Sequence, residues 1–138
     1  MKTGFACGVF DLFHAGHVLM LMECKKHCDH LLVGVNAAGN IDSAINPGKS
    51  EPVYSLWERK LILEACRFVD EVVVYNSEAE LLDILKSRKI DIRFLGDDYR
   101  GKKITGSELN IPIHYTDRSH GLSSSAYRKK ITGTDHSK

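Results

Sequence analysis

The sequence has few of the features that mark specialised classes of protein. It contains three prolines, one tryptophan and no run of about 18 apolar residues, so we predict no membrane-spanning helix. We find no internal repeat, linker or low-complexity block, and therefore expect one domain. The 19 lysines and arginines nearly balance the 18 aspartates and glutamates, for a formal net charge of +1. This balance disfavours a general nucleic-acid or membrane-surface binder, so an anion site must be a local group of cations.

The sequence gives little support for a secretion signal or a metal cluster. The apolar N-terminal stretch is interrupted by Gly4, Gly8 and Asp11, and no small-residue cleavage site follows, so we interpret it as a first strand. Cys24 and Cys28 are one helical turn apart, with His27 and His30 nearby, but this is poor spacing for zinc. We expect these thiols, with Cys7 and Cys66, to be reduced in a cytoplasmic protein, and leave open any role beyond packing.

The remaining pattern alternates strands and helices. The order predicts an α/β fold, a Rossmann-like doubly wound five-stranded parallel sheet with helices on both faces. We assign residues 1–131 to one domain and 132–138 to a flexible tail. The expected strands are 5–10, 31–35, 71–75, 91–95 and 111–115, and the expected helices are 15–28, 55–67, one from residue 77, and 123–131.

Local signals support several of these boundaries. Ser55 with Glu58, and Ser77 with Glu80, form two predicted capping boxes at helix starts. Pro112 near the start of the last strand suits an edge position. Ligands of such sheets bind beyond the carboxyl ends of the strands, so we expect the chemistry in four segments. These are 11–17, the long loop 37–54, 96–103 and 118–124.

Two histidines stand at the first of these places. His14 and His17 are three residues apart, so their side chains lie on one side of a helical turn. Free N–H groups at a helix start favour an anion, and Gly16 leaves room for a phosphate near the backbone. The pattern predicts two imidazoles that donate hydrogen bonds to a phosphate.

These residues resemble a known family. His14-Ala15-Gly16-His17 is similar to the HxGH signature of the nucleotidylyltransferase superfamily, and the first signature, GVFDLFHAGH at 8–17, resembles its cytidylyltransferase branch. The second signature, RSHGLSS at 118–124, is similar to RTEGISTT in that branch. The stretch 96–102, GDDYRGK, resembles GDDW-x-GK of glycerol-3-phosphate cytidylyltransferases. Segments 58–60 and 69–72 agree, so the resemblance covers about 4–131.

The resemblance implies a nucleotidyltransferase. An acceptor phosphate would attack the α-phosphorus of a nucleoside triphosphate in line, and pyrophosphate would leave without a covalent enzyme intermediate. His14 and His17 would hold the α-phosphate oxygens, Lys49 would close over the phosphates from the long loop, and Arg118 would hold phosphate oxygens with its planar fork. Magnesium is expected mainly on the nucleotide phosphates, with no protein metal ligands.

The resemblance also implies binding residues. Arg59, Tyr99 and Lys49 are expected at the acceptor, although Arg59 could equally pair with Asp70. Asp11 suits an outer contact or a turn cap equally well, and Asp97 with Asp98 suits base, ribose or magnesium. The expected nucleotide-binding residues are Gly8, Val9, Phe10, Asp11, Gly16, Gly96, Asp97, Arg118, Gly121, Leu122, Ser123 and Ser124.

The substrates remain open at this point. The 96–102 stretch favours CTP and sn-glycerol 3-phosphate, giving CDP-glycerol, although Tyr99 stands where that family has Trp and His120 replaces an acidic residue. The alternatives are adenylyl transfer from ATP to heptose 1-phosphate, pantetheine phosphate or flavin mononucleotide. An inactive nucleotide-binding module or a nucleotide hydrolase would be proteins of another class. The family usually pairs through the first signature and the long loop, so we expect a homodimer.

Overall fold

A computed structural model describes residues 1–37 and 51–133 of the chain. Lys49 and most of the tail assigned to 132–138 therefore lie outside the described residues. The elements are β1 (Thr3–Gly8), α1 (Ala15–Lys25), β2 (His30–Asn36), α2 (Leu56–Ala65), β3 (Glu71–Tyr75), α3 (Glu78–Ser87), β4 (Ile92–Gly96), η1 (Asp97–Tyr99), η2 (Ser107–Leu109), β5 (Ile113–Thr116) and α4 (Ser124–Thr132).

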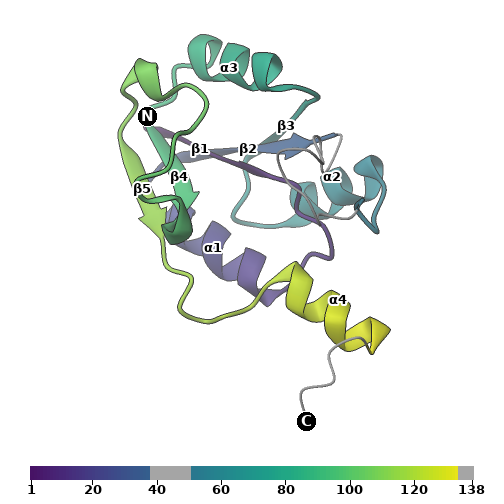
Figure 1. Ribbon diagram of the computed structural model, residues 1–138. Helices are drawn as coiled ribbons and strands as arrows, with labels where there is room; N and C mark the ends of the chain where they lie inside the picture. The colour runs from purple at the N-terminus through teal and green to yellow at the C-terminus, as the bar shows by residue number, and fades with distance from the viewer. Residues whose placement is uncertain (38–50, 134–138) are drawn as a thin grey trace.

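The strands form one five-stranded sheet in the order β3-β2-β1-β4-β5, with every pair parallel. α1 and α2 lie on one face of the sheet, and α3 lies on the other (Figure 1). This confirms the predicted Rossmann-like fold. The chain leaves β1 toward β2 but returns from β3 to β4 on the other side of β1, so the ligand crevice of this fold lies at the carboxyl ends of β1 and β4.

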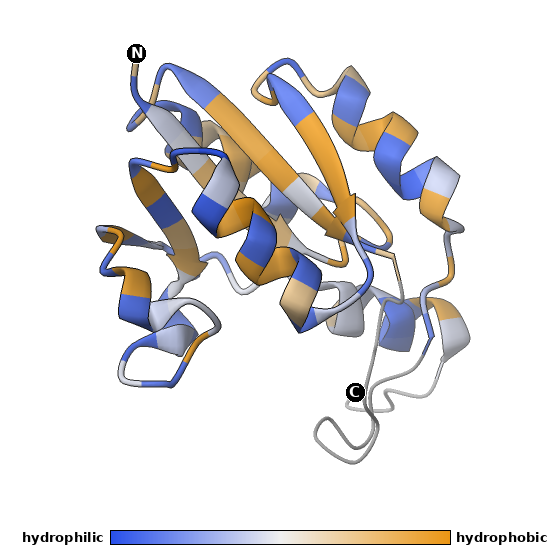
Figure 2. Ribbon diagram, turned by 90° about the horizontal axis from the view of Figure 1, so that it is seen from above, coloured by the Kyte–Doolittle hydropathy of each residue, from blue (hydrophilic) through white to orange (hydrophobic). Residues whose placement is uncertain are grey.

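The core has two parts, one on each face of the sheet. Leu21 and Cys24 of α1 and Leu63 of α2 are fully buried against Leu31, Val33 and Val35 of β2. On the opposite face Leu81 and Leu85 of α3 pack with Phe5 and Leu32. The strands are largely hydrophobic, and the helices alternate between hydrophobic and hydrophilic residues (Figure 2). Each fully buried leucine contributes about 1.5–3 kcal/mol, so this burial is what fixes the strand ends that carry the site.

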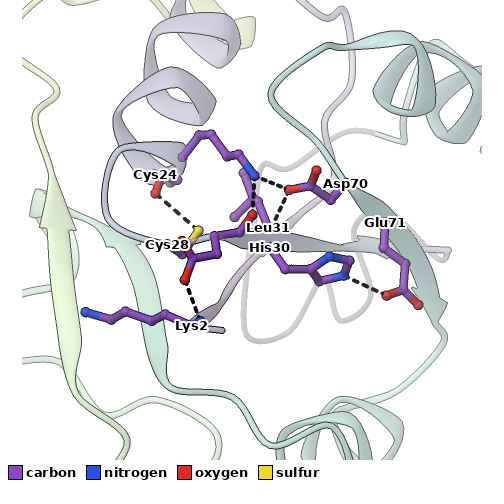
Figure 3. Close-up of polar contacts among 9 residues, drawn as sticks. Lys2, Cys24, Cys28, His30, Leu31, Asp70 and Glu71 are labelled. Atoms are coloured by element: carbon purple, nitrogen blue, oxygen red, sulfur yellow. Dashed lines mark hydrogen bonds and ion pairs between the residues drawn. The ribbon is translucent and has the colours of Figure 1, made fainter.

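A polar network closes the amino ends of the strands, away from the ligand crevice (Figure 3). The Asp70 carboxylate accepts from the Lys25 ammonium at 2.5 Å and from the backbone N–H of Leu31 at 2.7 Å. The Asp29 carboxylate accepts from the backbone N–H of Lys2 at 2.7 Å. Burial would raise the pKa of Asp70, but the contacts with Lys25 and Leu31 outweigh it and lower that pKa. Because Asp70 binds Lys25 and the Arg59 guanidinium donates to main-chain carbonyls, the predicted alternative of an Arg59–Asp70 pair is wrong.

Several predicted boundaries shift by two or three residues for local reasons. α1 ends at Lys25 and not at residue 28, and the Cys28 thiol donates back to the Cys24 carbonyl at 3.4 Å. β1 ends at Gly8 and not at residue 10, because Phe10 has a positive φ of 55°. β5 begins at Ile113, so Pro112 lies just before the strand, which is indeed at the sheet edge.

One capping box is confirmed and the other is half formed. Ser55 caps α2 and accepts from the N–H of Glu58, whose carboxylate accepts from the N–H of Ser55 at 2.9 Å. Ser77 caps α3 by accepting from the N–H of Glu80, but that carboxylate accepts from the N–H of Asn76. No helix within residues 1–37 and 51–133 is long and apolar enough to cross a membrane.

Candidate active site

The backbone is strained in the turn between β1 and α1. Phe10 and Leu12 adopt left-handed φ values of 55° and 50°, which cost about 1–3 kcal/mol each for residues other than glycine. The buried carboxylate of Asp11, between them, accepts from the N–H groups of Val53 and Tyr54, both at 2.8 Å. Asp11 therefore caps the turn and joins it to the chain that enters α2, which is one of the two roles expected for it.

Asp11 also pairs with Arg128 of α4. Burial would raise the pKa of Asp11, but the Tyr54 and Val53 hydrogen bonds and the Arg128 charge outweigh it and lower that pKa. The Asp11 carbonyl accepts from the Ser124 hydroxyl at 2.7 Å. These contacts hold the start of α4 against the first signature across more than 100 residues of sequence.

The two histidines cap α1 reciprocally. His14 is the N-cap residue, and its Nδ1 accepts from the N–H of Gly16 at 3.0 Å. The Nδ1 of His17 accepts from the N–H of His14 at 3.1 Å. The ring of His17 stacks on Phe13 with centroids 5.2 Å apart. Because both Nδ1 atoms are acceptors, each neutral ring carries its proton on Nε2, which leaves two N–H donors for a ligand.

The surroundings of both rings disfavour their protonation. Burial, followed by the charges of His14 and Arg118, lowers the pKa of His17 to about 4. Burial, followed by the charges of His120 and Arg118, lowers the pKa of His14 as well. Both imidazoles are therefore neutral donors at neutral pH, in surroundings that favour an anion.

Gly16 lets the two signatures approach each other. A Cβ at this position would lie 2.7 Å from Cε1 of His14 and 3.0 Å from Cβ of Leu122. The space beside Gly16 was expected to admit a phosphate, but the His14 ring and Leu122 lie next to it. A contact between Gly16 and the nucleotide stays a prediction.

The second signature forms a tight loop before α4. Gly121 has a φ of 72°, in the region that favours glycine, and its N–H donates to the Arg118 carbonyl at 3.2 Å. The N–H of Leu122 donates to Nδ1 of His120 at 2.9 Å. Ser123 is the N-cap of α4 and accepts from the N–H of Ala126 at 3.1 Å. The loop thus presents Arg118 and a capped helix start on the side of the histidines.

A polar hollow of about 520 Å³ lies beyond β4 and β5. Asp97 pairs with Arg100, and the Asp98 carboxylate lies 3.8 Å from the Arg118 guanidinium. A Cβ on Gly96 would lie 2.5 Å from Oδ1 of Asp98 and 3.1 Å from Cδ of Arg118, so both side chains lie close to this glycine. The hollow is lined by Asp97, Asp98, Asp117, Arg118 and Ser119.

Two predicted acceptor residues have different surroundings. Tyr99 is the last residue of η1, whose Asp97 and Asp98 line the hollow. It is 45% exposed, and the Lys102 ammonium lies 5.8 Å from its ring centroid. Arg59 is 2% exposed, and its guanidinium donates to main-chain carbonyls. Those carbonyls belong to Tyr54, Val9, Asn36 and Ala37. Arg59 therefore holds the backbone around the first signature, and its contact with an acceptor stays a prediction.

The structure brings together the first signature, the second signature and the 96–102 stretch, as expected for the carboxyl ends of β1, β4 and β5. It adds residues that the sequence analysis missed. Tyr127 lies with its ring centroid 5.0 Å from that of His14, and Arg128 reaches Asp11. Ser124 and Arg128 are four apart on a helix, so their shared face was available from spacing alone.

Residues 5–130 match the family described as cytidylyltransferase-like. The chain belongs to this family. The predicted superfamily and branch, those of the nucleotidyltransferases, are confirmed.

Similar proteins agree with the assignment. The chain is 36% identical over 129 residues to "Bifunctional protein HldE" of Campylobacter fetus, covering 94% of this chain and 28% of that protein. It is 35% identical over 133 residues to the protein of the same name from Wolinella succinogenes, covering 96% of this chain and 27% of that protein. The chain therefore spans less than a third of the curated relatives it matches.

Solved structures agree on the fold. The lipopolysaccharide core biosynthesis protein from Thermoplasma volcanium superposes with a TM-score of 0.62 at 29% identity, covering 83% of this chain and 93% of that one. Pantothenate synthetase from Thermus thermophilus has a TM-score of 0.54 at 13% identity, covering 94% of this chain and 64% of that one, and shows the fold alone.

Proposed function

We propose that this chain transfers AMP from ATP to a sugar phosphate, with heptose 1-phosphate as the leading acceptor, and releases pyrophosphate. The observation that carries the chemistry is the pair of neutral imidazoles, in each of which Nδ1 accepts a backbone N–H, so that the ring proton is on Nε2 and can be donated. Among the acceptors left open above, a heptose phosphate is supported by the neighbour described as a lipopolysaccharide core biosynthesis protein. Assembly of a sugar core consumes nucleotide-activated sugars, which is what such a transfer produces.

In the reaction, an oxygen of the acceptor phosphate attacks the α-phosphorus of ATP. The bond from that phosphorus to the bridging oxygen breaks, and pyrophosphate leaves with the electron pair. Charge grows on the α-phosphate oxygens, and the Nε2–H groups of His14 and His17 donate to them. Removing one such donor typically costs about 3 kcal/mol, or on the order of a hundredfold in rate.

The second signature would hold the leaving group. The start of α4 presents free backbone N–H groups and the positive end of the helix dipole, which suit the β- and γ-phosphates. Arg118 is half exposed and its contact with Asp98 is long, at 3.8 Å, so its guanidinium can exchange that carboxylate for phosphate oxygens. Lys49 is proposed to close over the same phosphates.

Magnesium is proposed to arrive on the nucleotide phosphates, where it would offset their charge. The nearby carboxylates already have partners, since Asp11 is held by backbone N–H groups and Arg128, and Asp98 faces Arg118. Within residues 1–37 and 51–133, no three His, Cys, Asp or Glu side chains gather as a metal-binding group.

CTP with sn-glycerol 3-phosphate is the second candidate. It is favoured by the 96–102 stretch, where the side chains of Asp98 and Arg118 lie close to Gly96 beside the polar hollow. The predicted cytoplasmic location and homodimer are carried forward as predictions, and sedimentation of the purified protein tests the dimer.

A grid of ATP, CTP, GTP and UTP against phosphorylated acceptors, read by product mass, tests the proposal. The acceptors are heptose 1-phosphate, glycerol 3-phosphate, flavin mononucleotide and pantetheine phosphate. We expect an ADP-sugar and pyrophosphate. CDP-glycerol would favour the second candidate, a nucleoside monophosphate formed without an acceptor would indicate a hydrolase, and nucleotide binding without turnover would indicate an inactive module.

A further inference from the structure

Glu23 connects the helix of the first signature to the strand that leads into the second. It lies on α1, nine residues after His14, and α1 lies beside β5 (Figure 1). One oxygen of its carboxylate, Oε2, lies 2.6 Å from Nε2 of His114 on β5. The other, Oε1, accepts from the backbone N–H of Asp117 at 3.1 Å. Both oxygens are thus bound to one segment, the end of β5.

The second of these contacts falls directly beside Arg118. The Asp117 carboxylate accepts from the N–H of Ser119 at 2.9 Å and from its hydroxyl at 3.0 Å. The two residues that flank Arg118, Asp117 and Ser119, are therefore hydrogen-bonded to each other. Asp117 is in turn hydrogen-bonded to Glu23 of α1. At the other end of the loop, Leu122 packs close to Gly16 on the first turn of α1. Arg118 is held between two attachments to the helix that His14 caps.

The surroundings of Glu23 strengthen its contact. The side chains of Glu23 and His114 are 27% and 29% exposed. His114 also lies 4.1 Å from His27 and 5.9 Å from Phe94, measured between ring centroids. An exposed ion pair typically contributes about 0–1 kcal/mol to stability, because water screens it. Water weakens the hydrogen bonds of the partly buried Glu23 carboxylate less, so we expect its contribution to be larger.

We infer that Glu23 is a positioning residue for Arg118, setting the distance between its guanidinium and the two catalytic imidazoles. The inference rests on the proposed role of Arg118 as a phosphate ligand. Glu23 itself does not contact substrate; it holds the segment that carries the arginine. A merely structural contact would change the unfolding free energy alone, whereas a positioning residue changes nucleotide binding through Arg118.

The test compares Glu23→Ala, Arg118→Ala and the double variant by steady-state kinetics with the nucleoside triphosphate. We expect Glu23→Ala to raise the KM for the nucleotide about tenfold, with a smaller change in kcat. In the Arg118→Ala background the same change should add less than about twofold, because residues that act through one another are not additive. Glu23→Gln retains an oxygen acceptor for Asp117, so it should recover most of the affinity.

The control is Glu64→Ala, which removes an ion pair with Lys60 at 2.9 Å on α2 and should leave KM unchanged. Thermal unfolding shows whether each variant is folded. If Glu23→Ala is not folded, His114→Phe carries the test, because it removes the partner of Oε2 of Glu23 and should raise the KM for the nucleotide in the same direction. A wild-type KM in a folded Glu23→Ala protein, or a full additive loss in the double variant, would overturn the positioning role alone. Unchanged kinetics in Arg118→Ala would overturn the proposed phosphate ligand and this inference with it.

Discussion

The imidazole rings of His14 and His17 lie with their centroids 4.0 Å apart. At this separation two protonated rings would repel each other strongly, and burial disfavours the charge further. The backbone N–H groups that each ring accepts fix its orientation, so the first turn of α1 sets the direction of both Nε2–H donors. The helix cap and the proposed catalytic pair are therefore the same two side chains.

His17 should titrate far below the usual histidine range. Its folded pKa is lowered to about 4, so NMR of the ring protons should give a midpoint near that pH in the free protein. Phosphate groups bound beside the ring favour its charged form, so saturating nucleotide should raise the midpoint. A free-protein midpoint near 6.5, or one that nucleotide lowers, would contradict the described surroundings.

The same shift makes stability fall on acidification. The unfolded chain binds a proton on His17 near pH 6.5, while the folded protein binds it only near pH 4. Unfolding free energy should therefore be retained above pH 6.5 and decline between pH 6.5 and 4, by on the order of 3 kcal/mol for this group. Urea unfolding of wild type and His17→Gln across that window measures it, and equal slopes for the two proteins would count against the prediction.

Asp11 should contribute strongly to the free energy of unfolding. Asp11→Asn removes a buried charge opposite Arg128 and weakens the acceptor for Val53 and Tyr54, so we expect a loss of about 3 kcal/mol. The matched control is Asp97→Asn, which alters an exposed pair with Arg100 and should stay within about 0.5 kcal/mol. Equal denaturant midpoints for the two variants would show that Asp11 does not hold the turn.

Gly16→Ala should reduce activity although alanine favours helices. Helix propensity alone predicts a gain of up to about 1 kcal/mol at this position. A new Cβ would meet the His14 ring at 2.7 Å and Leu122 at 3.0 Å, so the ring and the second signature must shift. We expect at least a tenfold loss in kcat/KM. Gly121→Ala is the comparison, because its Cβ would meet open space and only its φ of 72° is strained; a fully active Gly16→Ala protein would refute the close contact.

Local patterns predicted much of the fold. The continuous apolar run at 31–35 indicated a strand buried on both faces, and the alternation of strands with helices indicated the parallel sheet. Ser55 and Ser77 are the helix caps that their spacing from Glu58 and Glu80 predicted. These signals succeed because each depends on residues within a few positions of one another.

The contacts that assemble the site depend on long-range packing. Arg128 meets Asp11, and Glu23 meets His114 and Asp117, across about 90 to 120 positions. The periodicity of a sequence does not indicate which charged side chains meet when helices pack on a sheet. Arg59 was therefore expected to bind a substrate phosphate or to pair with Asp70, and its contacts with main-chain carbonyls were missed. The reciprocal histidine cap was also missed, since serine, threonine, aspartate and asparagine are the usual N-caps.

The most direct test replaces each imidazole while keeping its cap. His14→Asn and His17→Gln retain an oxygen that can accept the same backbone N–H but lose the Nε2–H donor. His30→Gln, at the opposite end of the sheet in a pair with Glu71, is the control. With pyrophosphate release as the measurement, the account predicts a fall in kcat on the order of a hundredfold for each of the first two variants, an unchanged unfolding midpoint for His14→Asn, and normal turnover for the control. Wild-type turnover by folded His14→Asn and His17→Gln proteins would contradict it.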